Sequence, residues 1–406
     1  ATVRVLTRHG CEVVIARGME AKSPGNSRSE WLFQKASGQA VRLRADGTAD
    51  YKNKDMISTV KKGTVLVRVL PPEFTPEAGW DVLGKERKPE LPAGPGVEAG
   101  ANVKVEKQAD GSLHYVADCD GELKTDKGRV EIVAAYTIKG NVDSATGNIK
   151  FPGPVNIAGD VMSGFYVMSG GDIKINGSVE ASLLSADQDI MVQGGIKGAG
   201  KALLRSKRHI LATFVEYSTL LAIGDIKVKK SILRSTVKCN SRILMADDAS
   251  IIGGEIKVKS GMQLGNLGSE NAIPTKVDFG SDILVEDQIG VEEKEIQKLQ
   301  EQIVSVNNAM KQPDKMSDKA AMQELFNTKI ACMKMLEKRN LRLFSLKERF
   351  EQHYPSEIIV KGTIFPGVAF ECHGRSMEVH QKKSKVRISF DTSTGKIVEK
   401  PIEGKT

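Results

Sequence analysis

The sequence has little cysteine, few aromatic residues and no long apolar run. Its five cysteines are scattered, odd in number and never spaced as C-x-x-C, which argues against a disulfide framework and favours a reducing compartment. Aromatic residues make up only 5% of the chain, so aliphatic side chains must fill most of any core. No apolar run is long enough to cross a bilayer, and the alternating start, ATVRVLTRHG, is not typical of a secretory signal. We therefore expect a cytoplasmic protein without a transmembrane segment.

Charge and chain length set wider bounds. The 406 residues are enough for two to four domains, and the net charge of +8 permits an anionic partner without requiring one. The chain begins at Ala1 instead of Met, so we expect the full-length protein to have a segment before it.

The first part of the chain, residues 1–135, is predicted to be an N-terminal β-rich domain. Short alternating runs are separated by turn dipeptides in which Gly follows Asp, at Asp46–Gly47, Asp110–Gly111 and Asp120–Gly121. This pattern is typical of a meander of antiparallel strands.

Residues 136–287 carry a repeated β-rich phrase, which predicts a parallel β-solenoid. The phrase appears as VNIAGDV from Val155, DIKINGSV from Asp172, DIMVQGGI from Asp189, DIKVKKSI from Asp225 and EIKVKSGM from Glu255, at intervals of roughly 16 to 20 residues in most cases. A repeat this short cannot bury its own apolar side chains, whereas stacked coils bury them along one axis. Side chains alternate along a strand, so the Ile and Val of I-K-[IV] point inward and the Lys points outward.

Two other repetitive architectures fit less well. A leucine-rich horseshoe has a similar period but requires L-x-x-L-x-L-x-x-N, which is absent. A doubly wound α/β sheet requires helical segments of ten or more residues between strands, and the gaps here are too short.

Residues 288–354 predict an inserted antiparallel coiled-coil hairpin. Apolar residues at Ile296, Leu299, Ile303, Val306 and Met310 follow the 3,4 spacing of a coiled-coil seam. Gln312–Pro313–Asp314 breaks the helix, and Ser317 or Asp318 can cap the next one. The second helix is predicted to use a less regular stripe, namely Phe326, Ile330, Met333, Leu336, Leu343 and Phe350. Residues 355–406 return to strands, and we expect them to pair near the solenoid or the first domain and to cover an exposed coil end.

The segment GGIKGAGKA, Gly194 to Ala202, has the spacing of a phosphate-binding loop. Ala202 stands where such a loop has a Ser or Thr that binds magnesium, and the following residues alternate like strands and not like a helix. We interpret Gly194, Gly195, Gly198 and Gly200 as corners of the solenoid that require positive φ.

Two clusters contain metal-ligating residue types. Asp118, Asp120, Glu122 and Asp126 lack the spacing of a calcium loop and are interpreted as a solvated turn. Cys372, His373 and His380 offer soft ligands but make an incomplete zinc set, so we interpret them as strand residues of a capping sheet. No nucleophile–His arrangement stands out either. The sequence therefore predicts no metal, no cofactor and no catalytic residues.

Outward-facing cations form the candidate binding site. Lys174, Lys227 and Lys257 occupy the same place in three phrases, and stacking in register would align them as a ladder. Lys229, Lys230 and Arg234 lie close by in the sequence, with Lys238 and Arg242 beyond them. The alternative is a solvated face that only prevents aggregation. As a functional site, the ladder would dock an acidic protein, a membrane surface or nucleic acid, and nucleic acid is disfavoured because no aromatic residues are interleaved to stack on bases.

The order of several short phrases resembles the bacterial flagellar assembly protein A (FapA) family. They include KKGTVLVRVLPPEFTPEAGWDVLGK, DGSLHYVADCDGEL, GNVDSATGNIKFPGPVNIAGDV, GGDIKINGSV, ASIIGGEI and GTIFPGV. The resemblance implies a β-rich N-terminal region, a right-handed parallel β-solenoid and a coiled-coil hairpin inserted near the end. It also implies a role in flagellar assembly or cell-pole organisation through protein contacts.

We therefore expect a non-enzymatic bacterial scaffold or regulatory protein. Its implied partners are a polar or flagellar protein, or an acidic-faced signalling component such as one of the sugar phosphotransferase system. The hairpin is expected to be an exposed arm that can bind a partner helix or a second copy of the chain. One alternative is a basic solenoid that binds nucleic acid or membrane. Another is a polysaccharide-acting β-helix enzyme, which would need paired carboxylates on one outward face.

Overall fold

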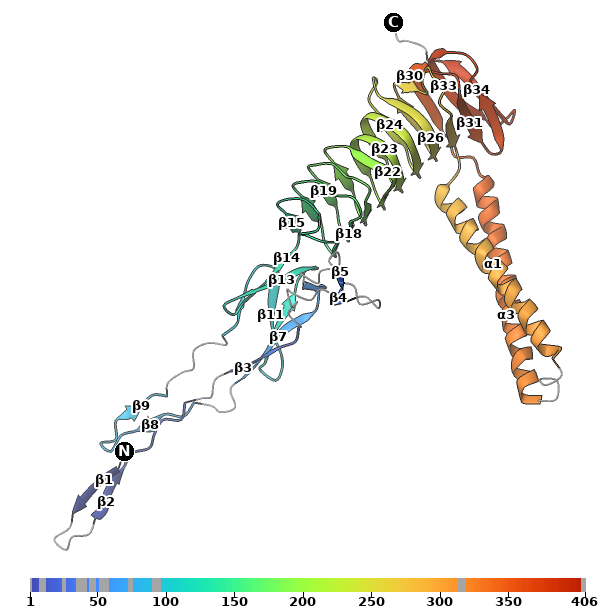
Figure 1. The fold of residues 1–406 in the computed structure, drawn as a ribbon. Coiled ribbons are helices and arrows are strands. Elements are labelled where there is room, and N and C mark those ends of the chain that lie inside the picture. The colour runs from blue at the N-terminus through green and yellow to red at the C-terminus, as the bar shows by residue number, and fades with distance from the viewer. Residues whose placement is uncertain are drawn as a thin grey trace. The chain divides into compact units, whose positions relative to one another are not determined.

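The computed structural model describes residues 2–6, 12–23, 27–33, 42–43, 49–50, 58–71, 76–89, 96–312 and 319–402. By its internal contacts the chain forms two compact units, residues 1–137 with 147–156 and residues 138–146 with 157–406. The first unit contains small sheets and short hairpins, and the second contains a long parallel sheet and two helices (Figure 1).

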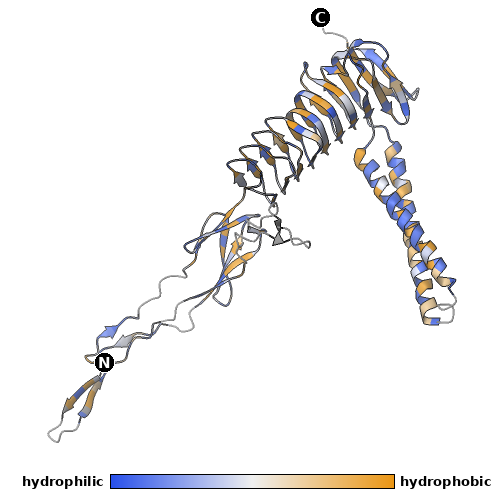
Figure 2. Cartoon of the chain, in the orientation of Figure 1, coloured by the Kyte–Doolittle hydropathy of each residue, from blue (hydrophilic) through white to orange (hydrophobic). Residues whose placement is uncertain are grey.

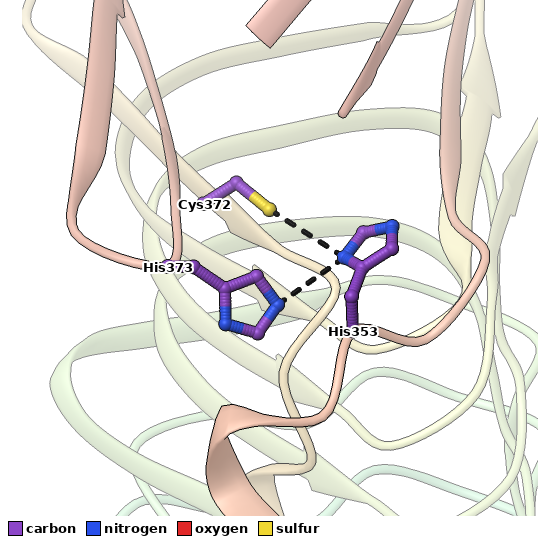
Figure 3. Close-up of side chains that lie close together, drawn as sticks. All are labelled: His353, Cys372 and His373. Atoms are coloured by element: carbon purple, nitrogen blue, oxygen red, sulfur yellow. Dashed lines mark hydrogen bonds between the residues drawn. The ribbon is translucent and has the colours of Figure 1, made fainter. Parts of the chain in front are cut away.

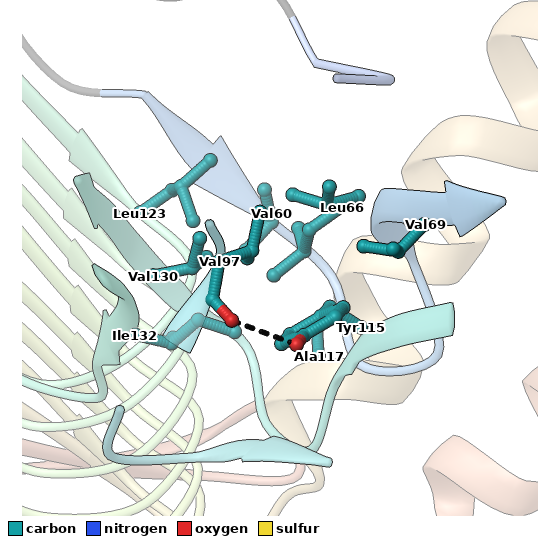
Figure 4. Packing of buried hydrophobic residues seen from close by; sticks show 10 residues of the cluster. Val60, Leu66, Val69, Val97, Tyr115, Ala117, Leu123, Val130 and Ile132 are labelled. Atoms are coloured by element: carbon teal, nitrogen blue, oxygen red, sulfur yellow. Dashed lines mark hydrogen bonds between the residues drawn. The ribbon is translucent and has the colours of Figure 1, made fainter. Parts of the chain in front are cut away.

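The first unit has its core in two four-stranded sheets. One sheet has the order β10 (Glu98–Ala99), β14 (Arg129–Val133), β13 (Gly121–Asp126), β6 (Thr59–Val60), and the other β11 (Val103–Lys107), β12 (Leu113–Ala117), β7 (Val65–Leu70), β3 (Arg28–Trp31). Buried aliphatic residues of both sheets surround Tyr115, whose hydroxyl donates a hydrogen bond to the carbonyl of Val97 at 2.9 Å (Figure 4). The β-rich character predicted for this part is confirmed.

Short hairpins make up the rest of this unit. They pair β1 (Thr2–Leu6) with β2 (Glu12–Arg17), β4 (Arg42–Leu43) with β5 (Ala49–Asp50), and β8 (Gly79–Trp80) with β9 (Glu86–Arg87). Asp110–Gly111 forms the predicted turn between β11 and β12, with Gly111 at φ 80°. Asp46–Gly47 lies outside the described residues, although β4 and β5 on either side of it pair antiparallel.

A parallel β-solenoid forms most of the second unit, as the repeat phrases predict, and its first strands include residues that cluster with the first unit. Its strands pair in parallel with the strand one turn later, at intervals of 16 to 20 residues (Figure 1). The right-handed winding that the family resemblance implies stays a prediction. The strands are β15 (Tyr136–Ile138), β16 (Ile149–Phe151), β17 (Val155–Ile157), β18 (Tyr166–Ser169), β19 (Ile173–Ile175), β20 (Leu183–Ala186), β21 (Ile190–Val192), β22 (Ile196–Ser206), β23 (Ile210–Ala222), β24 (Ile226–Cys239), β25 (Ile243–Met245), β26 (Ser250–Val258), β27 (Gly261–Leu264), β28 (Asn266–Leu267) and β29 (Thr275–Phe279).

Aliphatic side chains stack along the inside of the solenoid. One column of successive turns, fully buried throughout, consists of Ile173, Ile190, Ile210, Ile226 and Ile243. Each such side chain stabilises the fold by about 1.5–3 kcal/mol relative to leaving it in water. Buried and less buried residues alternate along these strands, and the outward positions carry both charged side chains such as Lys174 and apolar ones such as Met191. Figure 2 shows hydrophilic and hydrophobic residues along the solenoid.

The Asp that opens three of the phrases, Asp172, Asp189 or Asp225, fixes a corner. The carboxylate of Asp172 accepts a hydrogen bond from the backbone N–H of Asp189 at 3.1 Å, and that of Asp189 accepts one from the N–H of His209 at 3.0 Å. In the next turn Nδ1 of His209 accepts from the N–H of Asp225 at 2.9 Å. Each corner thus satisfies a backbone donor of the following turn, which explains why the phrase begins with a polar residue.

Three of the four glycines of GGIKGAGKA serve a different purpose from the one predicted. Of the four, Gly200 alone has positive φ, at 77°. At Gly195 an added Cβ would lie 2.0 Å from the Phe214 ring, and at Gly194 it would lie 2.5 Å from the carbonyl oxygen of Gly177. The prediction of positive φ is therefore wrong for Gly194, Gly195 and Gly198, which are needed because neighbouring turns approach too closely for a side chain. Residues 196–206 form β22, whereas a phosphate-binding loop requires a helix to begin there.

Two helices, α1 (Ile283–Met310) and α3 (Lys319–Glu351), pack against each other as the predicted hairpin. Helix α1 begins at the N-cap Asp282, whose side chain accepts hydrogen bonds from the N–H groups of Leu284 and Val285. The proposed break at residues 312–314 follows the end of α1, and Ser317 and Asp318 lie outside the described residues. Neither helix has the uncharged apolar length that a membrane span requires.

Helix α3 contacts α1 through a stripe that differs from the predicted one. Its less exposed residues follow a regular 3,4 spacing and include Met322, Leu325, Lys329, Cys332, Leu336, Arg339, Leu343, Leu346 and Phe350. The prediction was wrong for Phe326, Ile330 and Met333, which are exposed. The true seam contains polar residues, so its 3,4 spacing is not visible as an apolar pattern. A second apolar stripe on α3 has helical spacing and resembles a seam in the sequence.

The C-terminal strands resume the solenoid before they close it. Strand β30 (Glu357–Ile364) pairs in parallel with β27 and β28, and β31 (Val368–Cys372) pairs in parallel with β29. Antiparallel pairing then follows, with β32 (Arg375–Glu378) on β31, β33 (Lys383–Asp391) on β30, and β34 (Lys396–Pro401) on β33. The segment therefore pairs with the solenoid, as expected, and also contributes two of its strands.

Candidate functional site

Two of the predicted cations, Lys174 and Lys227, share one outward column of the solenoid. The parallel registers place these residues in the order Lys174, Met191, Leu211, Lys227, Leu244 and Gln263 on successive turns. The two lysines are therefore separated by apolar side chains and do not form a continuous ladder.

Lys257 lies in another column. It pairs in register with Lys238 on one side and Asp278 on the other, on a different face of the solenoid from Lys174 and Lys227. The prediction that the three lysines align is therefore wrong for Lys257. The phrases EIKVK and DIKVK are similar in sequence but lie on different strands of a solenoid turn. The connection between the two phrases places the later one on another face of the solenoid.

The column of Lys257 anchors the helical hairpin. Nζ of Lys257 lies 2.6 Å from Oε1 of Glu286 on α1, and Nζ of Lys238 lies 3.5 Å from Oδ1 of Asp287. Burial lowers the pKa of Lys257, but the hydrogen bond and charge of Glu286 outweigh it and leave the pKa raised. Cations that were candidates for a partner site are thus used within the chain.

A shallow hollow of about 500 Å³ lies over the column of Lys227. Its lining is mainly apolar, with Met191, Leu211, Leu244 and Met245 beside the aliphatic stems of Lys227 and Lys229. Among the described residues, no ion pair involves Lys174, Lys227, Lys229 or Lys230, and all four are exposed. We call this surface, lined by Met191, Leu211, Lys227, Lys229, Leu244 and Met245, the solenoid groove.

Arg234 is held against an aromatic ring. Its guanidinium donates a hydrogen bond to the hydroxyl of Tyr217 at 3.2 Å and lies 5.9 Å from the ring centroid. Both residues have positive φ, 42° for Arg234 and 46° for Tyr217. Arg234 and Tyr217 therefore form a rigid polar corner, and Arg234 is less available to a partner than the lysines of the solenoid groove.

Two carboxylates do lie side by side on an outward face, which is the feature expected of a polysaccharide-acting enzyme. Asp278 and Glu371 are register partners in β29 and β31. However, Lys257 lies 3.8 Å from Asp278, and Lys276 forms an ion pair with Glu371. Each carboxylate of the pair therefore has a lysine beside it.

The outer surface of α3 carries an apolar stripe that includes Phe326, Ile330 and Met333, three residues predicted to lie in the seam. Its exposed residues are Phe326, Ile330, Met333, Leu341 and Phe344, with Leu341 and Phe344 exposed to 67% and 65%. Ile330, Met333, Leu341 and Phe344 also line a hollow of about 680 Å³. We call these five residues the outer stripe. Two interleaved apolar periods on one helix were the signal in the sequence that could have revealed it.

Comparison with known proteins gives a family but no individual relative. No curated protein and no solved structure gives a significant match to the chain. The model of the Flagellar Assembly Protein A β-solenoid domain matches residues 134–397, and that of the N-terminal region of the same family matches residues 3–128. Together these matches cover most of the chain and connect it with flagellar assembly. The chain therefore belongs to the Flagellar Assembly Protein A family.

Proposed function

We propose that the chain is a non-enzymatic scaffold or regulatory protein of the bacterial cytoplasm that acts in flagellar assembly or cell-pole organisation by binding other proteins. The outer stripe of α3 is the observation that supports this most. Five large apolar side chains lie exposed on a helix that packs against α1 through a different face. Exposed apolar surface of this kind is typical of a protein–protein interface.

The proposed occupant of the outer stripe is the same stripe of a second copy. A stripe with helical spacing is complementary to another amphipathic helix, and a two-fold dimer pairs a surface with itself. The arm would thereby join two solenoids, each with its own solenoid groove, and two linked sites bind a bivalent partner more tightly than one.

Sedimentation velocity of the whole chain at several concentrations tests the role of the outer stripe. Phe344→Glu places a charge in the stripe and should shift the chain from dimer to monomer. Ser345→Glu adds the same charge at the exposed neighbouring position and should leave the dimer intact. A wild-type chain that stays monomeric at every concentration would contradict self-association and leave a helix of another protein as the occupant.

The solenoid groove is the proposed site for an acidic-faced protein. Apolar side chains supply contact area, while Lys227 and Lys229 can pair with carboxylates at the rim. The rigid strands lose little conformational freedom on binding, so little entropy opposes association. A soluble component of the sugar phosphotransferase system and a polar or flagellar protein are the partner classes proposed here.

The groove is tested with purified candidate partners. Lys227→Glu should weaken binding of an acidic-faced partner at least tenfold, since it replaces attraction with repulsion at the contact. Lys201→Glu is the matched control, because Lys201 is also exposed but lies on β22 outside the groove. Equal affinity of the two variants for every partner that binds the wild-type chain would refute this site.

A further inference from the structure

Three metal-ligating side chains converge where the helical hairpin joins the solenoid. His353 follows the end of α3, while Cys372 ends β31 and His373 begins the turn after it (Figure 3). Nδ1 of His353 lies 3.2 Å from Nε2 of His373 and 3.9 Å from Sγ of Cys372. The three ligand atoms all lie within 4.8 Å of one another.

The sequence places a different histidine, His380, close to Cys372 and His373. His380 is exposed and does not belong to the cluster. His353 takes its place, although it precedes Cys372 by 19 residues. The interpretation of Cys372 and His373 as plain strand residues is therefore incomplete, because the close of the hairpin returns a third ligand to them.

The surroundings hold both imidazoles in place on one side of the cluster. The Phe390 ring packs against both histidines, with centroids 5.0 Å and 5.6 Å away. At Gly280, just before α1, an added Cβ would lie 3.0 Å from Nδ1 of His353 and 3.2 Å from Sγ of Cys372, so this glycine leaves space beside the ligand atoms.

His373 occupies a backbone conformation that histidine rarely adopts. Its φ is 47° and that of Gly374 is 71°, and the register partners Cys372 and Arg375 close a two-residue turn around them. Such turns favour Asn–Gly, and positive φ costs a residue other than Gly, Asn or Asp roughly 1 kcal/mol or more. The turn would therefore also accept Asn at position 373.

The distances fit a tetrahedral zinc ion. Nitrogens at about 2.0–2.1 Å from zinc lie about 3.3 Å apart, and such a nitrogen and a sulfur at about 2.3 Å lie about 3.6 Å apart. Two of the three separations here, 3.2 Å and 3.9 Å, are close to these values, and the third is at most 4.8 Å. One thiolate and two imidazoles also match the preference of zinc for sulfur and nitrogen ligands.

We propose that His353, Cys372 and His373 form a binding site for Zn²⁺ that fastens the root of the helical hairpin to the end of the solenoid. Three protein ligands leave the fourth position for water, which the partial exposure of both histidines allows. The bound ion would tie the segment after α3 to the end of β31, so it would limit movement of the hairpin relative to the last turns of the solenoid.

Titration of the chelator-treated whole chain with Co²⁺ tests the site. Cobalt should bind at one equivalent with a near-ultraviolet sulfur-to-cobalt charge-transfer band, and Zn²⁺ should displace it and raise the unfolding temperature. Cys372→Ser should abolish the band and weaken binding by at least about 100-fold, since even outer-shell changes cost about 10- to 100-fold. The control Cys239→Ser removes another fully buried thiol, which donates to backbone carbonyls at 3.3 Å, and should leave the band unchanged.

His373→Asn separates metal binding from folding. Asn–Gly is the preferred sequence for this turn, so the metal-free variant should be at least as stable as the wild-type chain while binding cobalt more weakly by at least about tenfold. His380→Gln should match the wild-type chain in both respects. The proposal is overturned if the wild-type chain shows no charge-transfer band at one equivalent, or if His373→Asn retains full affinity.

Discussion

Nζ of Lys259 lies 2.6 Å from Oδ2 of Asp282, while Oδ1 of the same carboxylate caps α1. The side chain of Asp282 thus connects Lys259, which directly follows the solenoid strand β26, to the first residues of the hairpin. Lys259 also lies 3.8 Å from the centroid of the Tyr354 ring, just beyond the end of α3. A single lysine therefore contacts both ends of the inserted hairpin.

Asp282→Ala should destabilise the chain by about 2–4 kcal/mol, because it removes the helix cap and leaves Lys259 without its carboxylate. Asp282→Asn retains the capping oxygen and should cost less. Asp287→Asn is the control, since Asp287 is mostly exposed and lies 3.5 Å from Lys238, and it should cost under about 0.5 kcal/mol. Urea unfolding, monitored by the helical circular dichroism signal, gives the free energy of unfolding of all three variants. An equal loss of stability in Asp282→Ala and Asp287→Asn would contradict a special role of Asp282.

The pKa of Asp278 predicts a pH dependence of stability. Burial raises this pKa from 3.8 to about 6, and Glu371 and Glu286 add to the rise, while Lys257 and Lys276 oppose it. At a pH between these two pKa values, Asp278 is protonated in the folded chain and ionised in the unfolded chain. The contribution of Asp278 to the free energy of unfolding therefore falls as the pH rises from 4 to 6. Asp278→Asn should remove this decline. The difference in free energy of unfolding, variant minus wild type, should therefore increase from pH 4 to pH 6 and then level off. A difference that stays constant with pH would contradict the assigned pKa of Asp278.

Much of the fold could be predicted because the inner residues of the solenoid obey a simple rule. Ile173, Lys174 and Ile175 alternate in, out and in, and the repeat of such phrases suffices to infer stacked turns. The face on which a phrase lies was not predictable, because connections of variable length moved Lys257 to another face. Residue periodicity also could not separate the two apolar stripes of α3, since the true seam contains Arg339.

The metal-ligating cluster shows a second limit of the sequence. Cys372 and His373 could be recognised as soft ligands, but nothing in the local sequence points to His353. The position of His353 depends on how the hairpin closes. The closed hairpin brings the segment after α3 back to Gly280, three residues before the start of α1. Contacts of this kind follow from tertiary structure and leave no spacing pattern.

Gly195→Ala should destabilise the solenoid through overpacking. Its added Cβ would lie 2.0–2.4 Å from atoms of the Phe214 ring, and inserting a methyl group into a packed core costs about 1–3 kcal/mol. Gly140→Ala is the control, because no atom lies within 4 Å of its added Cβ. Chemical denaturation should show a loss for the first variant only. Phe214→Leu should partly restore the stability of Gly195→Ala, and the absence of any rescue would place the cause of destabilisation elsewhere.

The buried ion pair in the hairpin seam sets its register. Glu292 is 3% exposed, and both of its carboxylate oxygens accept from Arg339, at 2.8 Å and 3.0 Å, while Arg342 lies 3.2 Å away. Glu292 occupies a seam position of α1, seven residues before Leu299, and Arg339 occupies one of α3. A polar pair at such positions disfavours other alignments, because a shifted register would leave both charges buried and unpaired.

Single and double changes separate stability from register. Arg339→Leu should cost about 3–5 kcal/mol because it leaves Glu292 buried with only the exposed Arg342, whereas Glu292→Leu with Arg339→Leu should recover most of that loss. The double variant should nevertheless associate more heterogeneously, since two leucines pair equally well within one chain and between chains. Thermal unfolding by circular dichroism gives the stabilities, and sedimentation velocity gives the distribution of species. A double variant as unstable as Arg339→Leu, or one that sediments like the wild-type chain, would show that this pair does not specify the register.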